Sequence, residues 1–281
     1  YITFRLLDFA DLTVDGSIAT GAAVSVMLIR AGVSPIATLP IAFLAGALAG
    51  MVTGLLNTAL GIPGILASIL TQISLYSINL NIMGKANQPV SVDNYPLVVS
   101  LRYVTDGSVS RLLFFLGMIV FLLALIAVMY WYFGTEQGHA IRATGCNSNM
   151  ARAQGINTNF LKVLALMISN GLVGLCGALY GQFQGASDVN MGRGAIVIGL
   201  AAVIIGEVLF GKFASKRKLA FAFTLASVIL GAVIYYMVYQ FVLWLKMPSE
   251  DMKLFSAIVV AIFLAIPYLK EKRTLRKGAS K

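Results

Sequence analysis

The stretch LLFFLGMIVFLLALIAVMYWYF, residues 112–133, has no charged residue, and the polar stretch EQGHAIRATGCNSNMARAQGIN follows it at 136–157. A membrane-spanning helix needs about 20 consecutive apolar residues, so the first stretch predicts a transmembrane helix. Similar stretches recur along the 281-residue chain, which is 59% hydrophobic and only 11% charged. A soluble domain carries about a quarter charged residues. The sequence therefore predicts an all-α polytopic membrane protein.

The apolar stretches are separated by short breaks that contain glycine, proline or charged residues. We expect a fragment at 1–7 to be the end of a first helix whose beginning is missing, which gives about 8–10 transmembrane helices in all. Residues 1–269 then form a single transmembrane domain, and 270–281 form a basic tail. The expected helices are 17–31, 36–57, 62–83, 111–133, 159–183, 194–211, 219–245 and 253–269.

The charged residues between the expected helices predict the orientation in the membrane. Segments 134–162, 212–218 and 270–281 hold 13 basic and 2 acidic residues, whereas 84–111, 184–193 and 246–253 hold 6 and 5. Basic loops stay cytoplasmic, so we expect the first three segments and the C-terminus inside the cell. The net charge of +10 is thus a topology signal. No nucleic-acid partner is expected, since the basic residues do not gather on one folded face.

The segment DFADLTVDGS, residues 8–17, carries Asp8, Asp11 and Asp15 too close together for an ordinary apolar helix. Counting back from a cytoplasmic C-terminus places residue 1 outside if every segment spans once. A broken or re-entrant stretch here would restore a cytoplasmic N-terminus. We also expect Asp11 or Asp15 to cap the helix that follows.

Two of the expected helices carry glycines at spacings that form a smooth ridge and permit close packing with a neighbouring helix. One ridge is Gly46, Gly50 and Gly54, and the other is Gly171, Gly174, Gly177 and Gly181.

Polar side chains at helical spacing form a stripe on the expected helix 62–83. Hydrogen-bonding groups in lipid are costly, so a stripe of this kind faces a cavity or a neighbouring helix. Both alternatives, lining of a solute pathway and interhelical hydrogen bonding, stay open. Asp11 and Asp15 are further pathway candidates at membrane depth. The stripe consists of Ser68, Gln72, Tyr76 and Asn79.

The polar stretch 136–157 contains a short amphipathic segment, NMARAQ, at 149–154. Asn147 or Ser148 can cap a helix there, and Gly155 can end it in a left-handed conformation. Such a helix would present Met150 as an apolar knob, with Arg142 and Arg152 at its flanks. We interpret it as an element that docks into a groove on another protein, the alternative being an idle cytoplasmic loop.

Catalytic and nucleotide-binding signatures are weak. GEVLFGKF, residues 206–213, imitates a phosphate-binding loop, but Phe213 stands in place of the Ser or Thr that holds magnesium. No His, Cys, Asp and Glu cluster indicates a metal or acid–base site, so catalytic and metal residues are expected to be absent. Glu207 lies within an apolar stretch and needs a partner or water; we favour a structural role over a proton relay.

Several of these segments resemble ABC importer permeases of the branched-chain amino acid/ribose type, and the similarity extends over essentially the whole chain. DFADLTVDGS together with GRGAIVIGLAAVIIGE most resembles the subgroup described as tryptophan/tyrosine permeases. The segments that carry the resemblance are DLTVDGSIATGAA (11–23), LGIPGILASILT (60–71), AIRATGCNSNMARAQGIN (140–157) and IVIGLAAVIIGEVLFG (196–211).

The resemblance implies a type II ABC importer-like permease domain whose loop 134–158 couples to ATPase subunits. The expected partners are a second permease copy in a homodimer, two ABC ATPase subunits, an extracytoplasmic solute-binding protein and membrane lipid. The chain would hold no cofactor, because ATP and Mg are bound by the ATPases. The expected coupling residues are Arg142, Asn147, Asn149, Met150, Ala151, Arg152, Gln154 and Gly155.

We therefore expect the transmembrane subunit of an ATP-driven importer in a bacterial cytoplasmic membrane, with an amino acid, preferably aromatic, as its solute. Branched-chain amino acids, nucleosides and a pentose are alternatives for the same machinery. An ion-coupled secondary transporter is the alternative from another class, and it would need Glu207 or Asp11 as its coupling residue. A membrane-embedded enzyme lacks any catalytic constellation.

Overall fold

The computed structural model describes residues 1–91, 94–95, 97–100, 108–214 and 220–244, together with the single residues 258, 261 and 265. The expected helix 253–269, the loop 246–253, the tail 270–281 and the basic residues 216–218 fall outside this part, apart from those single residues. The chain divides into two compact units, residues 2–195 and Tyr1 with residues 196–281, and each is described by itself.

The described chain is almost entirely helical, which confirms the all-α polytopic class. Five of the described helices are long and apolar enough to cross a membrane, and a sixth apolar helix, Ala195–Phe210, is shorter. The predicted bounds are close to those observed. The helices of the larger unit are η1 (Ile2–Leu6), α1 (Val14–Arg30), α2 (Pro35–Thr58), α3 (Gly64–Met83), α5 (Ser108–Phe133), α6 (Glu136–Cys146), α7 (Ser148–Ala153) and α8 (Thr158–Gln184).

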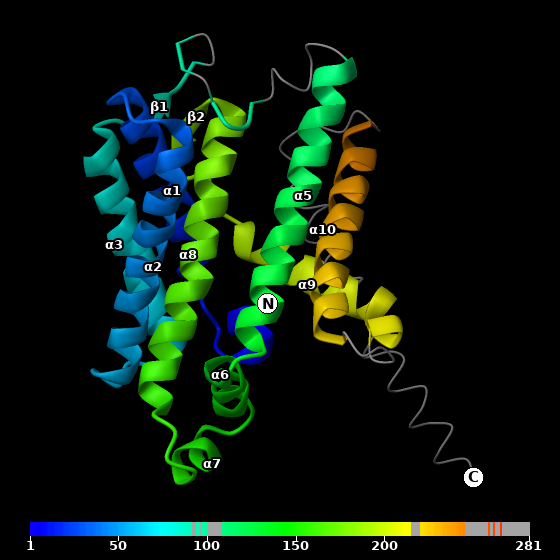
Figure 1. Ribbon diagram of the computed structural model, residues 1–281. Helices are drawn as coiled ribbons and strands as arrows, with labels where there is room; N and C mark the ends of the chain where they lie inside the picture. Colours follow the sequence, from blue (N-terminus) through cyan, green and yellow to red (C-terminus); the bar gives the residue numbers. More distant parts are fainter. Residues whose placement is uncertain are drawn as a thin grey trace. The chain divides into compact units, whose positions relative to one another are not determined.

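In the larger unit, α1 packs against α2, α3 and α8 (Figure 1). It can lie this close to three neighbours because its buried face consists largely of glycine, alanine, serine and threonine. Gly21 shows how closely they approach, since a methyl group there would overlap the carbonyl group of Gly174 on α8. The apolar surfaces of α2 and α3, in contrast, include large exposed side chains such as Leu44 and Ile65, as expected of helices that face lipid or another subunit.

The glycine ridge predicted on α2 packs against the backbone of α8. It meets the second predicted ridge only where Gly46 approaches Gly174, because Gly177 and Gly181 pack against α1. A methyl group at Gly46 would overlap the carbonyl oxygen of Asn170, and one at Gly50 would overlap that of Leu166. At Gly54 the added carbon would lie 2.9 Å from the Cα of Val163. Lipid supplies no hydrophobic drive for helix association, so this backbone contact and its dispersion energy hold α2 on α8. The prediction of close helix packing through these glycines is confirmed.

The N-terminal segment is broken, as the acidic residues indicated. The π-helix η1 is followed by irregular backbone at residues 7–13 before α1 begins. Within this break Asp8 has a left-handed φ of 52°, a conformation that aspartate tolerates better than most residues. The capping prediction is wrong. The N-cap residue of α1 is Thr13, without a side-chain cap, and Asp15 lies within the first turn.

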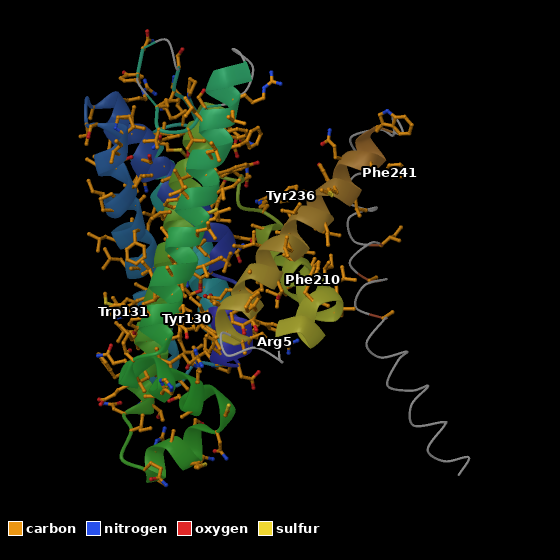
Figure 2. The ribbon with its side chains drawn as sticks, turned by 45° about the vertical axis from the view of Figure 1, so that its right-hand side comes forward. Arg5, Tyr130, Trp131, Phe210, Tyr236 and Phe241 are labelled. Atoms are coloured by element: carbon orange, nitrogen blue, oxygen red, sulfur yellow. The ribbon has the colours of Figure 1, made fainter. Side chains whose placement is uncertain are left out.

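The polar stretch after α5 contains two helices where the sequence predicted one. Thr135 caps α6 by accepting a hydrogen bond from the Gly138 amide at 3.4 Å. The helix was missed because its sequence, EQGHAIRATGC, has low hydrophobicity and two glycines. Gly138 and Gly145 permit close contact: methyl groups there would overlap the backbone of Phe133 and of Leu6, respectively. Figure 2 shows Tyr130 and Trp131 at the end of α5 that leads into α6.

Two short strands at the opposite end of this unit from α7 were not predicted (Figure 1). β1 (Asn87–Pro89) pairs antiparallel with β2 (Ala186–Asp188). They join the segment after α3 to the segment after α8. Three-residue strands have too little hydrophobic periodicity to be recognised in a sequence.

The smaller unit contains α9 (Ala195–Ala214) and α10 (Ala220–Trp244). Their close contact again depends on glycine, because a methyl group at Gly206 would overlap the carbonyl oxygen of Ser227. Tyr235 of α10 is buried against Ala201 and Ile205 of α9. Tyr236 and Phe241 of α10, labelled in Figure 2, are more than half exposed. Glu207 lies in α9 and is partly buried.

Candidate functional site

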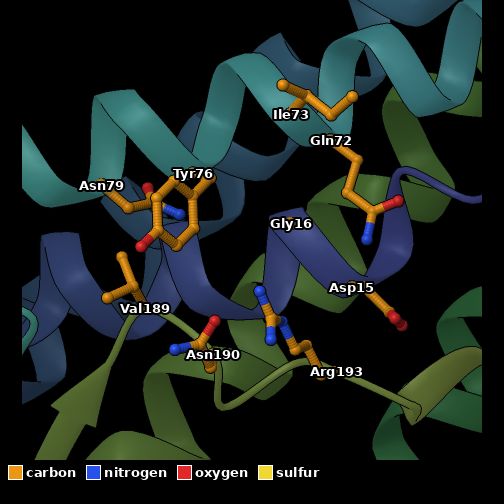
Figure 3. A pocket seen from close by; sticks show the side chains of 9 residues that line it. All are labelled: Asp15, Gly16, Gln72, Ile73, Tyr76, Asn79, Val189, Asn190 and Arg193. Atoms are coloured by element: carbon orange, nitrogen blue, oxygen red, sulfur yellow. The ribbon is translucent and has the colours of Figure 1, made fainter.

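A pocket of about 340 Å³ lies between α3, the start of α1 and the loop that follows β2. Figure 3 shows the side chains of Gln72 and Tyr76 from α3 above it, and Asn190 and Arg193 from the loop below it. All of these elements belong to the larger unit. The residues that line the pocket are Asp15, Gly16, Gln72, Ile73, Tyr76, Asn79, Val189, Asn190 and Arg193.

Three members of the polar stripe on α3 line this pocket. Gln72, Tyr76 and Asn79 are four and three residues apart, so the 3.6-residue period places them on one face of the helix. The fourth member, Ser68, is fully buried and donates its hydroxyl hydrogen to the carbonyl oxygen of Ile65 at 2.9 Å, within its own helix. Ser68 is not among the pocket residues, so the structure separates it from the other three.

Asn79 is the least ordinary side chain of the pocket. It is 0% exposed, and neither its amide nitrogen nor its carbonyl oxygen has a hydrogen-bond partner among the described residues. A buried polar group without a partner costs about 1–3 kcal/mol. A group of this kind in a pocket wall is therefore available to a molecule that enters the pocket.

The loop of residues 189–194 supplies the opposite wall and is held by several backbone contacts. The Asp188 carboxylate accepts a hydrogen bond from the Asn190 amide at 2.7 Å, and the Arg193 amide donates to the Asn190 carbonyl at 3.0 Å. Gly192 lies so close to α1 that a methyl group there would overlap the carbonyl oxygen of Asp15. These contacts give the loop a defined shape next to α1.

Asp15 fastens this loop to α1. Its carboxylate accepts a hydrogen bond from the amide of Gly194 at 3.0 Å, and Gly194 has a φ of +90° that suits glycine. In Figure 3 the carboxylate points away from Tyr76. Asp15 therefore lines the pocket, and its bond to Gly194 positions the loop. Its role in a solute pathway stays a prediction.

Asp11 lies elsewhere, in a buried hydrogen-bond network at the break before α1. It is 4% exposed, and its two carboxylate oxygens accept bonds from the amide of Thr13 at 2.9 Å and from the side-chain amide of Asn170 at 2.7 Å. Asn170 in turn accepts a bond from the hydroxyl of Ser17 at 2.7 Å. The network connects the broken segment to α1 and α8, and Asp11 is not among the pocket residues.

The sequence did not single out Asn190 or Arg193. In the sequence, Arg193 contributed only one basic charge to the segment 184–193. The available signal was the run of turn-forming residues SDVNMGRG at 187–194, which marks an ordered loop next to a helix start. The packing of this loop against α1 and α3 cannot be predicted from the residues of the loop alone.

A second candidate surface lies on α6 and α7, at the end of the unit remote from the two strands (Figure 1). Asn147 caps α7 as predicted, since its side-chain oxygen accepts bonds from the amides of Asn149 and Met150 at 3.1 and 3.0 Å. Gly155 has a φ of +81°, which confirms the left-handed stop. Ser148, the other cap candidate, is the first residue of the helix.

The predicted coupling residues divide into an outward and an inward set. Met150 is 63% exposed, whereas its neighbour Ala151 is 3% exposed. Arg152 donates a hydrogen bond from its guanidinium to the hydroxyl of Thr158 at 3.3 Å, which ties α7 to α8. Arg142 lies over the ring of Phe133, 5.8 Å from its centroid. The exposed members are Asn147, Asn149, Met150, Arg152, Gln154 and Gly155.

Comparison with known proteins decides the family. A family model described as "Branched-chain amino acid transport system / permease component" matches residues 1–267. The chain belongs to this permease family. The permease is accordingly the membrane component of an ABC transport system and a multi-pass protein of the bacterial inner membrane. Membership implies that ATPase and binding-protein partners complete the system.

Several curated proteins are similar to the permease over most of their length. A "Tyrosine transport system permease protein" of Clostridioides difficile (strain R20291) is 39% identical over 265 residues, which cover 94% of this chain and 84% of the relative. An "Inner membrane ABC transporter permease protein" of Escherichia coli (strain K12) is 26% identical over 74% of this chain and 62% of the relative.

An "Autoinducer 2 import system permease protein" of Yersinia pseudotuberculosis is 28% identical over 83% of the permease and 62% of the relative. No solved structure matches the permease. The resemblance to the amino acid/ribose type of ABC permease, and within it to tyrosine permeases, is therefore confirmed.

Proposed function

We propose that the permease is the transmembrane subunit of an ATP-driven importer that moves an amino acid, with an aromatic side chain favoured, into the cytoplasm. The observation that carries the proposal is the exposed helix α7, which presents Met150 outside the bundle while Ala151 is buried beneath it. The 39% identity to a tyrosine transport system permease supports the choice of solute. The relative named for autoinducer 2 shows that the family does not serve a single solute.

The structure of α7 is suited to a contact that transmits force from a partner to the helix bundle. A six-residue helix is too short to be stable alone, yet this one has an N-cap at Asn147 and a tie to α8 through Arg152. A short helix that is capped and tied to α8 in this way moves with the bundle. An ATPase that pushed on Met150 would therefore shift α8, and α8 packs along α1 and α2. Two packings of this bundle would supply the outward-facing and inward-facing states.

The proposed topology follows from the charges. The end that carries α6 and α7 faces the cytoplasm, because the loop 134–162 is basic. The end that carries β1 and β2 then faces a solute-binding protein outside the cell. Two copies of the permease would share one pathway, with two ATPase subunits that bind ATP and Mg below them.

The test is co-purification of the permease with its ATPase in mild detergent, comparing wild type with Met150→Glu. A carboxylate in the centre of an apolar contact is not compensated, so we expect the ATPase to be lost or strongly depleted. Asn159→Glu is the matched control. Asn159 is exposed, lies near α7 in the first turn of α8, and an acid is favourable there.

The ATPase is expected to remain bound to Asn159→Glu. Equal recovery of ATPase from wild type and from Met150→Glu would contradict the role of α7. If no ATPase accompanied the wild-type permease in several detergents, the importer proposal would fail, and an ion-coupled transporter centred on Glu207 would have to be tested instead.

A further inference from the structure

Two side chains of the pocket between α1, α3 and the 189–194 loop have no partner within the described part of the protein: Arg193, which is exposed, and Asn79, which is buried. Among the residues that the structure describes, the guanidinium of Arg193 has no hydrogen-bond or ion-pair partner, although the backbone of the same residue is fixed. The side chain of Asn79 is buried and equally without a partner. Both belong to one pocket, although they lie more than a hundred residues apart in the sequence.

We propose that this pocket binds the imported amino acid itself, with Arg193 holding its carboxylate. The inference rests on the proposed function and adds the site and its chemistry. Arginine presents a planar fork of donors that matches a carboxylate in a bidentate arrangement, and bonds of this kind are about twice as strong as neutral ones. Asp15, the other charged residue of the wall, is engaged by the Gly194 amide and keeps the Arg193 loop in place.

The rest of the wall suits the other two parts of an amino acid. Gln72, Asn79 and Asn190 offer side-chain carbonyl oxygens that can accept hydrogen bonds from an ammonium group. The exposed side chain of Ile73, the ring of Tyr76 and the side chain of Val189 offer apolar surface for an uncharged side chain. The pocket therefore has one cationic residue, Arg193, one acidic residue, Asp15, several amide side chains and apolar surface between them.

The charge of Arg193 favours an amino acid over a pentose or a nucleoside. A volume of about 340 Å³ is close to the lower limit of about 300 Å³ for ligand pockets, which suits a single small molecule. A pentose or a nucleoside has no carboxylate. Either would exclude water from Arg193 without supplying a countercharge, which is costly. A carboxylate-bearing solute removes that cost.

The proposal is tested by equilibrium binding of radiolabelled L-tyrosine to the purified permease–ATPase complex, with no binding protein present. Unlabelled competitors are 3-(4-hydroxyphenyl)propionate, which keeps the carboxylate and lacks the amino group, and tyramine, which keeps the amino group and lacks the carboxylate. On wild type we expect the propionate to compete better than tyramine. Arg193→Gln should weaken tyrosine binding about 10- to 100-fold, the usual range for hydrogen bonds to a charged group, and leave tyramine binding unchanged.

Lys85→Gln is the matched control, because Lys85 is exposed, lies just after the C-cap of α3 and is not part of the pocket. It removes the same charge and should bind tyrosine like wild type. Arg193→Lys keeps the charge without the fork, and we expect an affinity between those of wild type and Arg193→Gln. Retention of the ATPase by each variant shows that the permease is folded.

Equal tyrosine affinity of Arg193→Gln and Lys85→Gln would overturn the proposal. So would equal competition by tyramine and the propionate on wild type, or the absence of tyrosine binding to the wild-type complex. None of these results would contradict the proposed importer function, which is tested separately by recovery of the ATPase with Met150→Glu.

Discussion

Replacement of Asn170 by leucine is expected to destabilise the permease by about 2–4 kcal/mol, because Asn170 links the broken N-terminal segment to the bundle. Asn170 is fully buried in α8. Its side chain donates to the Asp11 carboxylate at 2.7 Å and accepts from the Ser17 hydroxyl at 2.7 Å. Leucine has a similar size, so the change removes the hydrogen bonds without leaving a large cavity.

The magnitude follows from these two bonds to other segments; a third, to the Leu166 carbonyl oxygen at 3.2 Å, lies within α8. A hydrogen bond to a charged group contributes about 1.5–3 kcal/mol, and neutral side-chain bonds in a membrane protein contribute about 0.6, with a maximum near 1.7 kcal/mol. The two values together give the expected loss. Because Asp11 is 4% exposed, water cannot easily replace the missing donor.

The assay is reversible unfolding of the purified permease by SDS in mixed micelles, followed by circular dichroism. Ser169→Ala is the matched control, since Ser169 is the adjacent buried residue and its hydroxyl has no hydrogen-bond partner among the described residues. We expect its free energy of unfolding to be close to that of wild type. In the double variant Asp11→Leu/Asn170→Leu the loss should be smaller than the sum of the two single losses, because neither partner is then left unpaired.

A free energy of unfolding for Asn170→Leu equal to that of Ser169→Ala would refute the reasoning. It would mean that the segment 7–13 is held by its backbone and apolar contacts alone. Strict additivity in the double variant would show that Asp11 and Asn170 do not interact energetically, whatever their distance.

Two further predictions concern glycine packing and the cap of α7. Gly50→Val should prevent stable folding, because the new Cβ would overlap the Leu166 carbonyl and lie 3.0 Å from the Cβ of Asn170. Gly117→Val on α5 is the control, because nothing lies within 4 Å of a Cβ there. In size-exclusion chromatography the control should give wild-type yields of monodisperse protein. Asn147→Ala should destabilise α7 by about 1 kcal/mol through loss of its cap. The expected results are faster amide hydrogen exchange at Asn149 and Met150 and about fivefold weaker ATPase binding. Unchanged exchange at both amides would contradict the capping role.

The sequence by itself determined the fold class, most of the long helices and the element that is proposed to contact an ATPase. These features depend on local patterns. Apolar runs such as 112–133 satisfy their backbone in lipid only as helices, and glycines at four-residue spacing make a helix surface smooth wherever its partner lies. Asn147 and Gly155 mark the ends of α7 because capping and left-handed backbone are properties of single residues in their immediate surroundings.

Tertiary structure alone decided which polar residues gather. Three members of the α3 stripe line the pocket and Ser68 does not, since the stripe extends along the helix axis beyond the pocket. Asp11 and Asp15, four residues apart, separate into a buried network and a loop anchor because the break at residues 7–13 turns them toward different neighbours. Arg193 and Asn79 line one pocket only because the 189–194 loop packs against α1, a contact between distant segments that no local pattern of residues can specify.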